Sequence, residues 1–147
     1  MLSKSNKDFL AEVSDLAQMH SDVAAEIFKN KREDRGNIAL YHLSVIVKIS
    51  LRVLCLKHQI GSSDEDSLDT LFAKAYRYVP YDIAELEVSI RHWHKNLPYR
   101  AKSVLTSVEG NAYGRKIQRF YNDYVMPYLC EIEEAEAARS TKNIAMF

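Results

Sequence analysis

Hydrophobic and polar positions follow a helical period along most of the chain. From about Asn6 to Lys31, apolar residues recur every three or four positions, and acids and lysines fill the opposite side. This pattern predicts a long amphipathic helix. It ends in the charged run 29–35, which is followed by Gly36, a residue type that commonly terminates helices.

The next segment, from Ile38 to His58, is apolar on almost every side and too long for one ordinary strand. It predicts a central, buried helix. Its β-branched residues leave a pair of strands as an alternative, although no turn signal occurs before Gly61. Ser44, Lys48 and Arg52 are spaced by four and form a narrow polar stripe, which we expect to reach solvent between neighbouring helices.

Two capping-box patterns predict shorter helices after the central one. Ser62 with Glu65 opens an acidic helix that ends before Pro80, because the residue before proline avoids helical geometry. Asp82 with Glu85 opens a helix from about 83 to 96. The segment 99–105 could add one or two helical turns.

The C-terminal part of the chain predicts a last helix from about 112 to 138. Residues 109–114, with two glycines, look like the connection that precedes it. Pro127 removes a backbone donor, so a kink or break is expected there, and residues 140–147 are expected to fray. The predicted fold class is therefore all-α, a single helical-bundle domain of about five helices over residues 1–147.

Composition agrees with this architecture. A chain of 147 residues can build one core, and 47% hydrophobic residues with four glycines and three prolines exclude a disordered or fibrous chain. Cys55 and Cys130 lie in helical patterns and indicate reduced thiols, with a disulfide as the alternative. The polar N-terminus lacks a signal core and the longest apolar region is interrupted by polar residues, so we expect a cytoplasmic protein.

Charged residues of the same sign cluster in separate segments of the chain, although the formal net charge is zero. Residues 62–90 carry seven acids against two bases, and residues 91–119, here called the basic segment, carry seven bases against one acid. The basic segment is the candidate binding face, with Trp93 or Tyr99 offering a ring on which a base of single-stranded RNA or a nucleotide could stack. The candidate binding residues are Arg91, Trp93, His94, Lys95, Arg100, Lys102, Arg115, Lys116 and Arg119.

A structural role for the same charges is the alternative. The bases would then pair with the acidic helix inside the fold, or with the acidic C-terminal turn (Glu131, Glu133, Glu134, Glu136) of a second copy. The zero net charge argues against avid, sequence-independent nucleic-acid binding.

Motifs of known chemistry are missing from the sequence. No Glu-x-x-His pair of a di-metal bundle occurs, and His92 and His94 diverge by about 200° on a helix. Nucleophile elbows, P-loops and dinucleotide fingerprints are absent too, and His42 fits a core or boundary position. The sequence thus predicts no catalytic residue, metal or cofactor.

The order of the predicted helices resembles the HEPN family of small helical nucleotide- and RNA-handling domains. The likeness rests on the run 41–54, on Ile60-Gly61 and on the segment 66–71, and it covers roughly Ile38 to Leu129. Active members carry an Arg and, four to six residues further on, a His on a late helix. Arg91 lacks that spacing to His92 or His94, and Arg35 to His42 has it only at the entry of the central helix. The resemblance implies a member that binds without cutting RNA.

Two main functional hypotheses follow. The first is a non-enzymatic interaction module that self-associates, because nine tyrosines and a broad apolar face on the last helix exceed what one bundle seam requires. The second is a HEPN-like RNA- or nucleotide-binding domain that uses the basic segment. A bundle metalloprotein ranks last.

Overall fold

The computed structural model describes residues 2–95, 106–136, 143–144 and 147. In this part of the chain every regular element is helical, which confirms the all-α prediction. The longer helices are α1 (Lys4–Lys29), α2 (Gly36–Lys57), α6 (Ser107–Phe120) and α7 (Met126–Glu136). The shorter ones are α3 (Leu68–Ala75), α4 (Tyr81–Ala84) and α5 (Glu87–Lys95).

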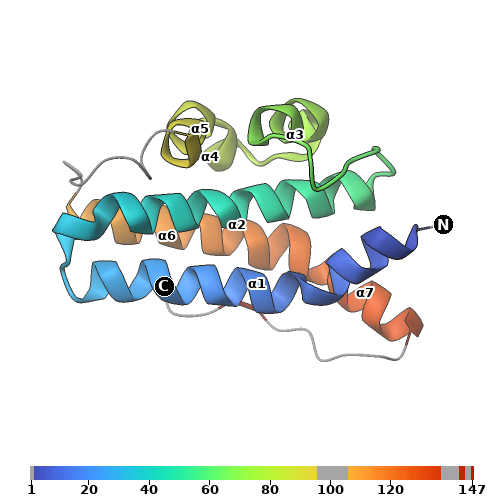
Figure 1. The fold of residues 1–147 in the computed structure, drawn as a ribbon, viewed down its shortest axis with the longest axis horizontal. Coiled ribbons are helices and arrows are strands. Elements are labelled where there is room, and N and C mark those ends of the chain that lie inside the picture. Colours follow the sequence, from blue (N-terminus) through green and yellow to red (C-terminus); the bar gives the residue numbers. More distant parts are fainter. Residues whose placement is uncertain (1, 96–105, 137–142, 145–146) are drawn as a thin grey trace.

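Helix α2 runs through the middle of the molecule. Helix α1 lies on one side of it and the short helices α3, α4 and α5 form a layer on the other side, while α6 runs alongside α2 and contacts both α1 and α4 (Figure 1). Sixteen of the 22 residues of α2 are buried, so it is the central helix that its sequence predicts and not a pair of strands.

The apolar character of α2 follows from this position. Among the described residues, the stretch Glu33–Lys57 alone has the length and composition to cross a membrane, and 67% of its apolar window is buried inside the bundle. A core helix of a soluble protein has the same composition. Both cysteines are free thiols, Cys55 buried in α2 and Cys130 half-buried in α7.

The polar stripe of α2 is covered at Ser44 and Arg52, which corrects the prediction that it reaches solvent; only Lys48 remains partly exposed. Ser44 is fully buried beneath His94 of α5. The Arg52 side chain is only 10% exposed, and its guanidinium lies 3.8 Å from the centre of the Phe9 ring of α1. The stripe is covered because helices pack on both sides of α2.

The predicted helix starts on this side of the molecule are wrong in detail. Ser67, not Ser62, caps α3, with its hydroxyl accepting from the Thr70 N–H at 3.1 Å. The single helix predicted over 83–96 is two helices, because the Leu86 N–H bonds to the Ile83 carbonyl three residues back and interrupts the helical ladder. Pro80 precedes α4 without a side-chain cap.

The predicted connection over 109–114 lies inside α6. A capping box of Thr106 and Glu109 starts this helix. Gly110 faces the Phe28 ring and Gly114 faces the Phe147 ring, each so closely that a Cβ atom would overlap the aromatic carbons. These two glycines therefore allow close packing and do not form a turn.

The interruption predicted at Pro127 is present as a π-helical turn, Tyr121–Val125, between α6 and α7. Proline cannot donate to the carbonyl four residues back, and the wider turn just before it accommodates the missing bond. Ile144 packs on this turn, where its N–H donates to Asn122 Oδ1 at 2.9 Å, and the Phe147 N–H donates to Gln118 Oε1 at 3.0 Å. Ile144 and Phe147 thus contact the bundle, and positions 140–142 and 145–146 of the predicted frayed tail lie outside the described part.

Helices α1 and α2 both end with a non-glycine residue in the left-handed region. Lys31 has φ 56° and Gln59 has φ 60°, and the next N–H closes onto the carbonyl five residues back, Arg32 to Ile27 and Ile60 to Cys55. Glycine favours this position because it has no Cβ. We expect Gln59→Gly to raise the free energy of unfolding by about 0.5–1 kcal/mol in urea denaturation.

The matched control for Gln59→Gly is Lys57→Gly, two residues earlier and still in right-handed helical geometry. There glycine costs about 1 kcal/mol. A loss of stability in both variants would show that Gln59 does not adopt the left-handed conformation.

Candidate functional site

The basic segment is divided between ion pairs and exposed side chains. Arg91 forms a two-pronged pair with Asp69 of α3, Nε to Oδ1 at 2.9 Å and Nη2 to Oδ2 at 3.0 Å, and a further pair with Glu87 at 3.3 Å. The hydrogen bond from Arg91 lowers the pKa of the Asp69 carboxyl. Lys116 lies 3.5 Å from Glu85. Two of the candidate bases therefore pair with acids of the preceding segment, as the structural alternative predicts.

The other candidate residues occupy different environments. Lys95, Arg115 and Arg119 are exposed, whereas His94 is half-buried. Trp93 is only 6% exposed and packs edge-on against Tyr113, so its ring is not open for stacking on a base. Arg100 and Lys102, with Tyr99, lie outside the described residues.

A row of four rings crosses α2, and only one of the four residues, His94, is among the candidate binding residues. It consists of His20 from α1, Tyr41 and His42 from α2, and His94 from α5, and is here called the imidazole band. Successive ring centres are 5.0 Å (His20–His42), 5.8 Å (His42–Tyr41) and 5.3 Å (Tyr41–His94) apart. Only the presence of His42 and His94 on separate helices could have pointed to it.

Ser44 determines the tautomer of His94. Its hydroxyl proton is donated to the Tyr41 carbonyl at 2.5 Å, so at 3.1 Å from His94 Nδ1 the Ser44 oxygen must accept a hydrogen bond from Nδ1–H. The lone pair of neutral His94 is therefore on Nε2. Ser44 is fully buried and has no proton to give to His94. In this arrangement Ser44 is therefore not a nucleophile that His94 activates as a general base.

His20 and His42 face each other through their Nδ1 atoms, which are 2.7 Å apart. One nitrogen donates and the other accepts. Burial lowers the pKa of both rings, and the neighbouring charge of His42 lowers that of His20 further. The pKa of His94 is lowered by burial and by Lys48, against an opposing effect of Asp69. The band is thus uncharged near neutral pH.

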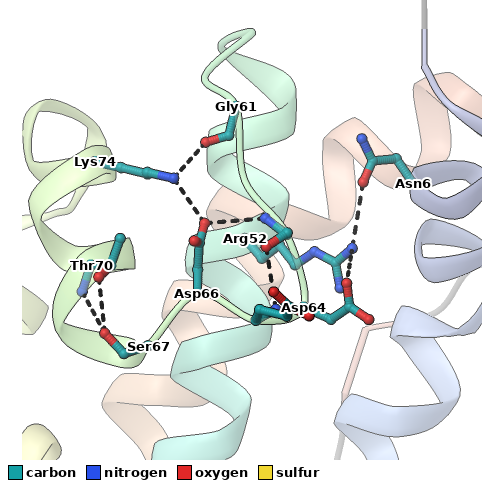
Figure 2. Close-up of polar contacts among 10 residues, drawn as sticks. Asn6, Arg52, Gly61, Asp64, Asp66, Ser67, Thr70 and Lys74 are labelled. Atoms are coloured by element: carbon teal, nitrogen blue, oxygen red, sulfur yellow. Dashed lines mark hydrogen bonds and ion pairs between the residues drawn. The ribbon is translucent and has the colours of Figure 1, made fainter.

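A second polar cluster organises the loop between α2 and α3 (Figure 2). Lys74 donates to the Gly61 carbonyl at 2.8 Å and to Asp66 at 2.9 Å, and Asp66 accepts from the Ser63 N–H at 3.1 Å. Lys74 holds the pKa of the Asp66 carboxyl below its usual range. This cluster fixes the path of the loop and leaves few groups for a ligand.

Arg52 lies beside the same loop. Its Nη2 is 3.4 Å from Asn6 Oδ1 and 4.0 Å from Asp64 Oδ1 (Figure 2), and its buried Nε has no hydrogen-bond partner in the described part of the chain. Burial lowers the pKa of the guanidinium, against the opposing charges of Asp64 and Asp66. Arg52 thus ties α1 and α2 to the loop.

The described surface includes the following two depressions. One, of about 270 Å³, is lined by Asp69, Val88, Arg91, His92 and Lys95 on the outer side of α3 and α5. The other, of about 560 Å³, lies at the end of the bundle and is lined by Leu2, Asn6, Leu56, Lys57, Gln59, Ile60, Gly61 and Tyr128. It has one charged residue, Lys57, so it lacks the convergent charged groups of a catalytic site.

No group of three or more His, Cys, Asp or Glu side chains that could hold a metal occurs among the described residues.

Large apolar and aromatic side chains are exposed on the layer of short helices. Tyr76 is 76% exposed, Tyr81 80% and Val88 76%. Tyr78 differs, since it stacks on His58 at 3.5 Å between ring centres. We call Tyr76, Tyr81 and Val88, with the smaller depression beside Val88, the outer face. This layer lies on the side of α2 opposite α1 (Figure 1).

The fold and these sites define an all-helical bundle with a central buried helix. Comparisons of the chain with protein-family models, with curated proteins and with solved structures found no match. Functional inference therefore rests on the residues themselves.

Proposed function

We propose that this chain is a non-enzymatic helical-bundle interaction module that associates with a second copy through its outer face. The observation that supports this most directly is the exposure of Tyr76, Tyr81 and Val88, each more than three quarters accessible. Tyrosine is enriched at protein interfaces because it combines a large apolar ring with a polar hydroxyl.

Charge supports association between copies. The formal net charge of the chain is zero, so two copies do not repel each other over long distances. Beside Val88, the depression carries both Asp69 and Lys95, charges of opposite sign that a second copy can match. The inert arrangement of Ser44 and His94 supports a non-enzymatic role.

The test is the oligomeric state measured by size exclusion with light scattering. We expect the wild type to form a dimer or larger assembly at tens of micromolar, and Tyr81→Ser with Val88→Ser to raise the dissociation constant at least tenfold, because an interface depends on few buried aromatic and apolar contacts.

The matched control for Val88→Ser is Val108→Ser on α6, where valine is equally exposed at 77%. It is expected to leave the assembly unchanged. A wild-type monomer at tens of micromolar would overturn the proposal. If Val88→Ser and Val108→Ser raise the dissociation constant equally, the interface does not lie on the outer face.

The alternative function is HEPN-like binding of RNA or a nucleotide by the basic segment, with weak or no ribonuclease activity. The exposure of Lys95, Arg115 and Arg119 favours it. Binding of labelled RNA that weakens steeply with salt and is lost in Arg91→Glu with Lys95→Glu would support this alternative. A cytoplasmic location is also part of the proposal, supported by the two free thiols and the buried position of α2.

A further inference from the structure

The imidazole band connects three helices through hydrogen bonds that involve ring nitrogens. His20 and His42 join α1 to α2, and His94 joins α5 to Ser44 of α2. Each ring is half-buried. The band therefore places groups that can gain a proton near physiological pH between packed helices.

The His20–His42 contact depends on protonation. An N–H···N bond needs one nitrogen with a free lone pair, and the 2.7 Å separation has room for one proton. If both rings are protonated, two N–H groups and two positive charges face each other. The Tyr41 ring packs edge-on against His42 of this pair.

His94 responds differently, because its Nδ1–H bond to Ser44 survives protonation. The added charge would lie near Lys48 of α2, which opposes it, and near Asp69 of α3, which favours it. Asp69 is already engaged with Arg91. Protonation therefore leaves a half-buried charge with an incomplete counter-ion at the C-terminal end of α5.

We propose that the imidazole band is a pH-sensitive clasp: acidification charges His20, His42 and His94 and loosens α1 and α5 from α2. Three rings whose pKa values are lowered in the folded protein bind fewer protons there than in the unfolded chain. The stability that the neutral band contributes is complete above pH 6.5 and is lost as the pH falls from there toward the lowered values. The clasp does not depend on the proposed self-association.

Hydrogen exchange of the full chain at pH 7.5 and 5.5 tests the clasp, in a range that lies above the titration of ordinary carboxyl groups. After correction for intrinsic exchange rates, we expect the opening equilibrium constant of α5 and of the middle of α1 to rise at least tenfold at pH 5.5. Amides of α7, which packs mainly on the π-helical turn Tyr121–Val125, serve as the internal reference.

Three variants locate the effect. His42→Gln and His94→Gln, which cannot take up a proton, should each remove at least half of the pH dependence in their own helix contact. His92→Gln, on the exposed side of α5, should keep all of it. An unchanged pH dependence in both band variants would refute the clasp.

Histidine NMR titration of the wild-type protein provides a measurement that does not require folded variants. The rings of His20, His42 and His94 are expected to remain neutral to lower pH than free histidine does. If all three become protonated at or above pH 6.5 without a change in α5 protection, the band is a static packing contact and the proposal is wrong.

Discussion

Gly110→Ala is expected to lower the free energy of unfolding by about 2–3 kcal/mol, the cost of overpacking a close-packed core. In an exposed helix the same change would add about 1 kcal/mol of stability, because alanine is the better helix former. The sign reverses here because the new methyl group would overlap the Phe28 ring, which is 2% exposed and is held within α1.

Gly114→Ala is the matched control one helical turn further along α6. Its methyl group would meet the Phe147 ring, which is half-buried where Phe28 is buried and therefore has more room to move. We expect a loss below about 1 kcal/mol. Urea denaturation of both variants checks the difference, and Phe28→Leu should restore part of the loss in Gly110→Ala. A neutral or stabilising Gly110→Ala would contradict the close contact of α1 and α6.

Leu43→Ala is expected to cost about 3–4 kcal/mol, within the range for removing a large side chain from a core that collapses only partly. Leu43 is fully buried in α2, the helix that packs against α1, α3, α5 and α6. Since domain stabilities are about 5–15 kcal/mol, this single change removes a large part of the total.

Ile38→Ala in the same helix is the comparison for Leu43→Ala, because Ile38 is 46% exposed. It should cost less than about 1 kcal/mol. The free energy of unfolding from urea titration, together with its dependence on urea concentration, measures both. Similar losses in the two variants would mean that α2 is not enclosed on both sides.

The sequence predicted correctly the helices whose hydrophobic pattern extends over many residues. The amphipathic period of α1 and the apolar run of α2 extend over many turns, so a single misleading residue does not change the prediction. Short signals were less reliable. Ser62 with Glu65 and Asp82 with Glu85 both fit capping boxes in the sequence, but loop contacts such as Lys74 to Asp66 decide where the helices begin.

The candidate site also has one part that could be predicted from the sequence and one part that could not. The structural alternative predicted that the basic segment pairs with the acidic helix, and the ion pair of Arg91 with Asp69 is one such pair. The imidazole band was not predictable, since His20 and His42 are 22 positions apart and Ser44 and His94 are 50 positions apart. No local sequence pattern indicates a contact between residues this far apart in the chain.

By itself, the sequence determined that this protein is an all-α bundle built around one buried helix, because burial of apolar side chains with a helical period depends on composition and spacing alone. Only the tertiary structure decided that Gly110 and Gly114 lie inside a helix, that Trp93 is covered, and that four rings meet across α2. These features depend on which faces pack together, and that is a property of helix contacts between distant parts of the chain.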